Sequence, residues 1–289
     1  MIALAMLMML ADGVHQHPGG KRLPHDKYVH VVPEAVSPLD KVYIPSKDGL
    51  GIAAVVRKPR GGGPFPVLLY FHGAPGGRGM DKLVTWARGD TGGPLWERFL
   101  QEGFMVVVAD YRNNVTRADD LIATMKDRVS YADDGVSVLN WVRQRKDADP
   151  ERIVVYGVSR GGNLALHLIS RERVAGAILG APAPAGFLGV REGGSIDEEV
   201  AARNIAGIQT PVLTLVGTAD RLIELDKPLH ERLIKAGKKA QLHIFENGYH
   251  DFVAGPQGHQ GRDEPLMDAT LEALELSVKF ARDCTAISR

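Results

Sequence analysis

From residue 41 onward, short apolar runs alternate along the chain with longer segments that have helical periodicity. Most of the apolar runs contain no alternating polar residues, which is typical of strands buried on both faces of a parallel sheet. The first two runs flank Ser46 to Gly49, a stretch whose composition favours a hairpin-like turn. The expected strands are residues 42–44, 52–57, 66–71, 104–108, 153–156, 177–179, 212–216 and 241–245.

Helical segments lie between these runs. In residues 133–145, for example, Val136, Leu139 and Val142 recur on one face of a helix. Strands that alternate with helices predict an α/β fold with a doubly wound, mostly parallel sheet of about eight strands, right-handed crossovers and helices on both faces. The expected helices are residues 96–102, 133–145, 164–170, 225–236 and 265–282.

Two stretches depart from this alternation. Residues 73–94 are rich in glycine and too long for an ordinary connection between a strand and a helix, so we expect them to rim the functional site. Residues 182–205 lie between two expected strands, where a small cap could be inserted. The chain has no internal repeat and no long linker, and residues 26–289 are therefore interpreted as a single domain.

Residues 2–11 are almost purely apolar and are followed by a polar stretch that contains glycine. This segment is too short to span a bilayer, so no membrane span is expected. Its length fits the apolar part of a signal peptide, although no Lys or Arg precedes it and no clean cleavage site follows it. Residues 1–25 are interpreted as an N-terminal segment and linker that is either an export signal or a helix packed on the domain. Both a cytoplasmic and an exported location stay open.

Composition narrows the range of partners. The 35 basic residues balance the 35 acidic residues, and no basic run is interleaved with aromatic residues. Nucleic acid is therefore not an expected partner. Cys284 is the one cysteine of the 289 residues, which excludes an intramolecular disulfide and a cysteine-based metal site. The sequence carries no signal for a particular oligomeric state.

The stretch around Ser159 has the pattern of a strand, a sharp turn and a helix. Ile153 to Tyr156 form the apolar strand, Gly157-Val158-Ser159-Arg160-Gly161 form the turn, and helical spacing follows from Leu164. In such a turn the serine is held in a strained conformation with its hydroxyl exposed, and the flanking glycines prevent collisions with strand and helix. A phosphate-binding loop is excluded because no Lys follows the glycines in the required position. Ser159 is the predicted nucleophile.

A serine hydroxyl needs a base, and the base needs a third group that holds its tautomer. Asp220 and His250 follow two later strands, in the order Ser, Asp, His, and the ends of parallel strands meet at one edge of a sheet. Taken alone, Asp220 could be a helix cap and His250 a surface residue; their order and position favour catalysis. Asp226 is expected well inside the next helix, and Asp251 adjoins the histidine too closely to turn back onto it.

Donors for an oxyanion are expected from two backbone N–H groups, that of Arg160 after the nucleophile and that of Ala74 in the glycine-rich loop. His72 is interpreted as a brace for this loop. Asp110 and Arg112 are interpreted as residues that hold loops in place. One further histidine, His243, lies within an expected strand and is interpreted as a core residue.

Four motifs carry a resemblance to a known family: residues 72–77 (His-Gly-Ala-Pro-Gly-Gly), 157–162 (Gly-Val-Ser-Arg-Gly-Gly), 217–220 (Gly-Thr-Ala-Asp) and 248–252 (Gly-Tyr-His-Asp-Phe). Over residues 40–285 the chain resembles the α/β-hydrolase superfamily, and within it the catalytic domain of the prolyl oligopeptidase family and its dienelactone-hydrolase-like relatives. The resemblance implies the α/β-hydrolase fold. It also implies Ser159 as nucleophile, His250 as base and Asp220 as the residue that orients it, with oxyanion amides at Ala74 and Arg160.

The chain departs from these relatives in three respects. The residues before 40 are too few for the propeller of the oligopeptidases, and Arg160 stands where several peptidases have Tyr. Dienelactone hydrolases proper use Cys where this chain has Ser159. The resulting expectation is a serine hydrolase that cleaves small carboxylic esters through an acyl-serine intermediate, without metal or cofactor. The alternatives are an exopeptidase or amidase acting on short peptides and a non-catalytic binding protein of the same fold.

Overall fold

The computed structural model describes residues 38–87, 93–112, 130–250, 252 and 264–286. The predictions for residues 1–25 and for Asp251 lie outside these residues.

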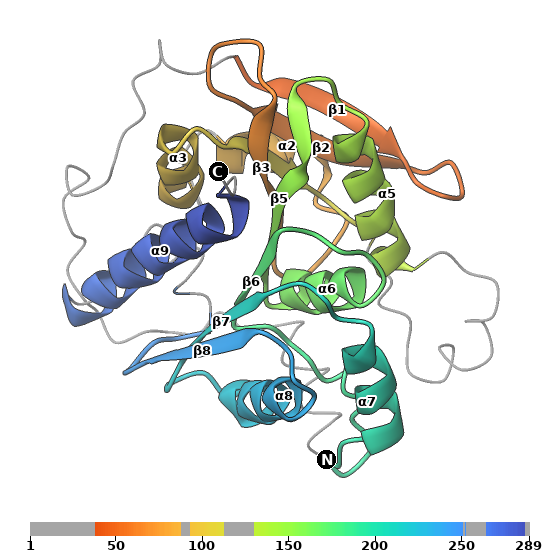
Figure 1. The fold of residues 1–289 in the computed structure, drawn as a ribbon, viewed down its shortest axis with the longest axis vertical. Helices are drawn as coiled ribbons and strands as arrows, with labels where there is room; N and C mark the ends of the chain where they lie inside the picture. Colours follow the sequence, from red (N-terminus) through yellow and green to blue (C-terminus); the bar gives the residue numbers. More distant parts are fainter. Residues whose placement is uncertain (1–37, 88–92, 113–129, 251, 253–263, 287–289) are drawn as a thin grey trace.

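A single sheet runs through the described part of the molecule (Figure 1). Its strands are β1 (Asp40–Pro45), β2 (Gly51–Arg57), β3 (Phe65–Phe71), β4 (Met105–Ala109), β5 (Ala148–Val158), β6 (Gly176–Gly180), β7 (Val212–Gly217) and β8 (Ala240–Phe245). They lie in the order β1-β2-β4-β3-β5-β6-β7-β8. Only the β1–β2 and β2–β4 pairs among these are antiparallel. The prediction of a mostly parallel sheet of about eight strands is confirmed.

Helices cover both faces of the sheet (Figure 1). They are α2 (Gly79–Thr85), α3 (Gly93–Gln101), α5 (Tyr131–Arg143), α6 (Arg160–Ile169), α7 (Glu198–Ala206), α8 (Ile223–Lys235) and α9 (Glu264–Thr285). Buried residues of α5, α6, α7 and α8 join one core cluster. Buried residues of α2, α3 and α9 join the other. This is the doubly wound arrangement that the alternation of strands and helices predicts.

The central strands have apolar side chains on both faces because both faces are covered. In β3, Leu69 and Phe71 belong to one core cluster, whereas Leu68 and Tyr70 belong to the other. All four side chains are buried. The sheet therefore forms a rigid platform from whose carboxyl edge the loops after β3, β5, β7 and β8 emerge.

The structure corrects two predictions about individual segments. His243 is not a core residue, because β8 is the last strand of the sheet and the His243 side chain is 41% exposed, 3.4 Å from the Glu272 carboxylate. Residues 73–94 are not one continuous loop, because α2 lies within them. Several elements also begin earlier than expected; β5 starts at Ala148, and α6 starts at Arg160, directly after the serine.

Residues 182–205 contain a series of turns and most of α7. Phe187, Leu188 and Ala201 of this segment are buried in the same core cluster as α5 and α6. A small cap formed by this segment stays a prediction, as does the division of the chain at residue 25. In the described part of the chain, no helix combines the length and the apolar character that a membrane span requires.

Candidate active site

Ser159 occupies the turn between β5 and α6 with φ 54° and ψ −117°, a conformation that a non-glycine residue adopts only under strain. The turn packs closely against β3. A Cβ atom at Gly161 would lie 2.2 Å from the Phe71 carbonyl oxygen, so only glycine fits there. The Ser159 N–H donates to the Gly180 carbonyl of the neighbouring β6 at 2.9 Å. The strand, turn and helix thus hold the serine in the geometry that its sequence pattern predicts.

Three side chains that are far apart in the sequence form one hydrogen-bonded chain. His250 Nε2 lies 2.8 Å from Ser159 Oγ, and His250 Nδ1 lies 2.8 Å from Asp220 Oδ2. The Asp220 side chain is 4% exposed and that of His250 is 39% exposed. A carboxylate can only accept, so the Nδ1 proton faces Asp220 and Nε2 is left to accept the serine proton. The arrangement can take a proton from Ser159 and later return it.

A direct backbone contact holds the two partner loops together. A Cβ atom at Gly217 would lie 1.9 Å from the Gly248 carbonyl oxygen, and the Ala219 N–H donates to that same oxygen at 3.1 Å. Asp220 also accepts the Leu222 N–H at 2.9 Å through its second carboxylate oxygen. Asp220 therefore accepts hydrogen bonds from the local turn and from His250 at the same time. Its interpretation as a cap and its interpretation as the partner of the histidine are compatible.

The loop after β3 passes beside the serine. A Cβ atom at Gly73 would lie 3.5 Å from Ser159 Cβ, which places the following Ala74 close to the serine. Arg78 braces this loop by donating to the Ala74 carbonyl oxygen at 2.7 Å. His72 lies with Nδ1 2.7 Å from the Gly73 carbonyl oxygen. The interpretation of His72 as a brace is confirmed by these contacts.

Asp110 anchors the same loop from the end of β4. Its carboxylate lies 3.1 Å from His72 Nε2 and accepts the N–H groups of Gly77 and Gly79 at 2.9 and 2.7 Å. Burial alone would raise the pKa of Asp110, but hydrogen bonds from His72 and Gly79 outweigh it and hold that pKa below its ordinary value. Arg112 is likewise structural, since it pairs with Asp48 and Asp134. Both predictions for these residues are confirmed.

The structure reveals surroundings of the site that sequence patterns did not indicate. The Arg160 guanidinium lies over the rings of Tyr111 and Tyr131, 5.9 and 5.1 Å from their centroids. Tyr131 donates to Asn163 at 2.5 Å, and Asn163 in turn donates to the Ala183 carbonyl oxygen at 2.6 Å. These residues come from α5, α6 and the loops that follow β4 and β6, and no local motif joins them. Arg160 and the two tyrosine rings that it contacts therefore lie next to Ser159.

Asp226 lies within the helix that follows Asp220, as expected; it belongs to the first turn of α8 and is fully buried. Its carboxyl oxygens have no hydrogen-bond partner among the described residues. Burial, together with the nearby charge of Asp220, raises the pKa of Asp226 to about 9. The spacing of Ile223, Asp226, Leu229 and Leu233 is the signal that could have revealed this burial, because it places the carboxyl group on the apolar face of the helix.

Among the described residues, no group of three or more His, Cys, Asp or Glu side chains is arranged to hold a metal ion. The chain is similar to an uncharacterized protein of Mycobacterium tuberculosis, with 24% identity over 265 residues that cover 85% of each chain. Its structure is similar to an esterase of Thermogutta terrifontis, with a TM-score of 0.63 and 23% identity over 89% of this chain and 94% of that one. It is also similar to EstE1, a carboxylesterase from a metagenomic library, with a TM-score of 0.61 and 22% identity over 89% and 92% of the two chains.

These structural similarities confirm the α/β-hydrolase fold that the motifs imply. The eight-stranded, mostly parallel sheet with helices on both faces agrees with this fold. Residues 53–280 match the dienelactone hydrolase family over most of the chain, and the chain therefore belongs to that family and is a hydrolase.

Proposed function

We propose that the protein is a serine esterase that cleaves small carboxylic esters through an acyl-Ser159 intermediate. The observation that carries this proposal is the unbroken chain of hydrogen bonds from Ser159 Oγ through His250 to Asp220, with 2.8 Å at each contact. Geometry of this kind activates a hydroxyl group that would otherwise be a poor nucleophile. The similarity to solved esterases supports an ester rather than another acyl compound as the substrate.

In the proposed reaction, Ser159 Oγ attacks the ester carbonyl carbon while its proton passes to His250 Nε2. The tetrahedral intermediate collapses as His250 returns this proton to the leaving alcohol, and an acyl-serine remains. Water then loses a proton to His250 and attacks the acyl carbon, which releases the carboxylic acid and restores Ser159. Asp220 stabilises the imidazolium that forms in each half of the cycle.

The oxyanion of each tetrahedral intermediate is proposed to accept hydrogen bonds from the Ala74 and Arg160 N–H groups. Two observations support this assignment. Arg160 is the first residue of α6, and N–H groups in the first turn of a helix have no acceptor within that helix. The loop that carries Ala74 passes next to Ser159 and is braced by Arg78, His72 and Asp110. Preorganised donors of this kind each contribute about 3 kcal/mol to lowering the barrier.

The test compares wild type with Ser159→Ala, His250→Ala and Asp220→Ala on a series of short-chain p-nitrophenyl esters. We expect kcat to fall by up to about a millionfold for the first two variants and by roughly ten-thousandfold for the third. Ser137→Ala is the matched control, since Ser137 Oγ bonds to a carbonyl of its own helix, Asp133 O, at 3.0 Å. It should keep the wild-type rate.

Two further measurements separate the alternatives. A fluorophosphonate should label wild type and not Ser159→Ala, and aminoacyl p-nitroanilides should be poor substrates. Anilide cleavage at a kcat/KM comparable to that for esters would instead support a peptidase or amidase. A wild-type protein that neither labels nor turns over would refute the assignment of Ser159 and favour a binding protein of the same fold.

A further inference from the structure

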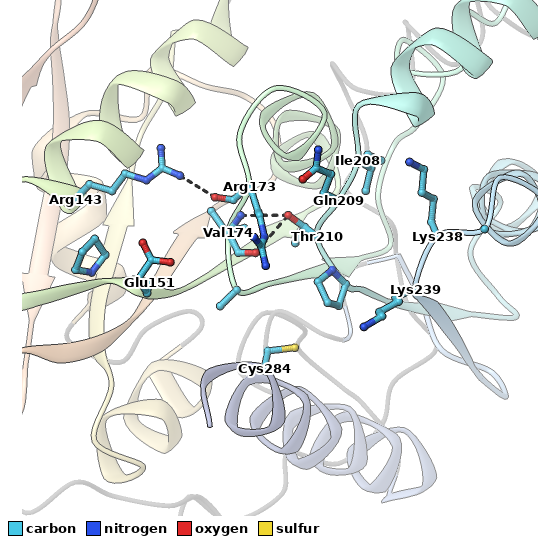
Figure 2. A pocket seen from close by; sticks show the side chains of 14 residues that line it. Arg143, Glu151, Arg173, Val174, Ile208, Gln209, Thr210, Lys238, Lys239 and Cys284 are labelled. Carbon is cyan, nitrogen blue, oxygen red and sulfur yellow. Dashed lines mark hydrogen bonds between the residues drawn. The ribbon is translucent and has the colours of Figure 1, made fainter. Parts of the chain in front are cut away.

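A pocket lies at the edge of the sheet opposite to Ser159. Its volume is about 760 Å³, and its lining comes from the segments that lead into β5, β6, β7 and β8, together with the last turn of α9 (Figure 2). Ser159 follows the carboxyl end of β5, whereas this pocket lies where the parallel strands begin. The length of the strands therefore separates the two places. The volume is within the range typical of small-molecule sites.

Four cationic side chains line the pocket, namely Arg143, Arg173, Lys238 and Lys239, against one acidic side chain, that of Glu151 (Figure 2). Of the four, only Arg143 forms an ion pair within the described part of the chain, with Glu172 at 2.7 Å. This concentration of positive charge contrasts with the whole sequence, whose net charge is zero.

The positions of these cations are partly fixed by the backbone. Arg143 also donates to the Arg173 carbonyl oxygen at 2.7 Å, and Lys238 donates to the Ala206 carbonyl oxygen at 2.9 Å. The Ala206 carbonyl group is neutral, so it holds the charge of Lys238 in place without compensating it, whereas the charge of Arg143 is compensated by Glu172. Arg173 and Lys239 are exposed, and Lys238 is exposed in part. Like charges gathered in this way repel one another, and a bound anion would relieve that repulsion.

The remaining lining is mixed, with Gln209 and Thr210 beside apolar side chains. Val174 and Ile208 are buried beneath the cations, and Pro150, Ala175 and Pro211 complete the apolar surface. We propose that this pocket binds a small molecule that carries a phosphate group on an apolar body. The phosphate would lie among Arg173, Lys238 and Lys239, since a phosphate group brings nearly two negative charges and several acceptor oxygens. The apolar part would lie against Pro150, Ala175 and Pro211, which reach the surface of the pocket.

The chain supplies its own reporter for occupancy of the pocket. Cys284 lies on α9 at the pocket lining and is half-buried, and it is the one cysteine of the sequence (Figure 2). Burial raises the pKa of the Cys284 thiol to about 11, so the reactive thiolate is a small fraction at neutral pH. A disulfide reagent at mildly alkaline pH should therefore modify the protein slowly at this single position, and a bound ligand should slow it further.

The experiment measures the rate of Cys284 modification in the full-length protein with and without phenyl phosphate. At about ten times the dissociation constant, we expect phenyl phosphate to slow the modification roughly tenfold. Benzyl alcohol and sodium chloride at matched ionic strength should not slow it. The double variant Arg173→Gln/Lys239→Gln should lose the protection, whereas Lys41→Gln/Lys47→Gln, with the same change of charge at exposed positions on and after β1, should keep it.

A second readout keeps the test independent of thiol reactivity. Phenyl phosphate should raise the thermal unfolding midpoint of wild type and of the Lys41/Lys47 control, and it should leave that of the Arg173/Lys239 variant unchanged. Protection that chloride reproduces, or that persists in the Arg173/Lys239 variant, would overturn the proposal. Neither readout uses ester hydrolysis, so the result stands apart from the assignment of Ser159.

Discussion

The buried carboxyl group of Asp226 makes a quantitative prediction about stability. In the unfolded chain this group ionises near the ordinary aspartate pKa of 3.8, whereas in the folded protein burial and the charge of Asp220 raise the pKa to about 9. Between these two values the folded state keeps a proton that the unfolded state has lost. Stability therefore falls as the pH rises through this window, by about 1.4 kcal/mol per pH unit.

Replacement of Asp226 by Asn removes this dependence, because an amide is neutral in both states. pH 7 lies about three units above the pKa of Asp226 in the unfolded chain, so Asp226→Asn should stabilise the protein by roughly 4 kcal/mol relative to wild type. Near pH 4 the two proteins should differ by less than about 1 kcal/mol. Activity at neutral pH should change little, since the neutral amide replaces a carboxyl group that is already neutral.

Urea unfolding of both proteins from pH 4.5 to 8, followed by fluorescence, measures the difference in the free energy of unfolding. Asp40→Asn is the matched control, because Asp40 is exposed at the start of β1 and its removal changes the net charge equally. The difference between Asp226→Asn and wild type should grow with pH, and that for the control should not. A difference that stays constant with pH would mean that Asp226 is ionised in the folded protein, and the argument from its burial would then be wrong.

Three further predictions concern other positions. Gly217→Ala should lower kcat for ester hydrolysis at least about a hundredfold, because a Cβ atom 1.9 Å from the Gly248 carbonyl oxygen must push apart the loops that follow β7 and β8. Gly62→Ala is the control, because a Cβ atom at Gly62 would have no neighbouring atom within 4 Å. Asp110→Asn should lower kcat about tenfold to a hundredfold with a smaller change in KM in steady-state assays, because it weakens the brace of the loop that carries the proposed oxyanion donor Ala74. Burial lowers the pKa of His167 to about 4, so between pH 6.5 and 4 the unfolded state binds a proton that the folded state does not, and stability should fall as the pH drops through this range. The urea midpoint of His167→Gln should fall less over this range than that of wild type.

The parts of the fold that the sequence predicts well are those with local causes. The strand before Ser159 is rich in apolar, β-branched residues, apolar residues recur at helical spacing in the helix after it, and the turn between them is rich in glycine. The order Ser159, Asp220, His250 could be used because parallel strands end at a common edge. Each of these inferences needs only the chain itself and one rule of sheet geometry.

The errors arose where a residue depends on its place in the whole sheet. His243 lies in a strand like any core residue, and only the position of β8 at the sheet edge leaves it exposed. The burial of Asp226 on the apolar face of α8 was not predicted, because a carboxyl group ordinarily lies on a solvated face. The contact of Arg160 with the rings of Tyr111 and Tyr131 was also missed, because the proximity of these residues follows from tertiary packing alone.

The contact between Gly217 and Gly248 helps to bring Asp220 and His250 together although they are 30 positions apart in the sequence. β7 and β8 are parallel neighbours paired through to Gly217 and Phe245, so the loops that follow them start side by side. Without side chains at these two glycines, the loop backbones approach until the Ala219 N–H reaches the Gly248 carbonyl oxygen. Asp220 and His250, which follow the two glycines closely in their loops, then face each other. The geometry of the Asp220–His250 pair therefore depends on strand register and on two glycine residues.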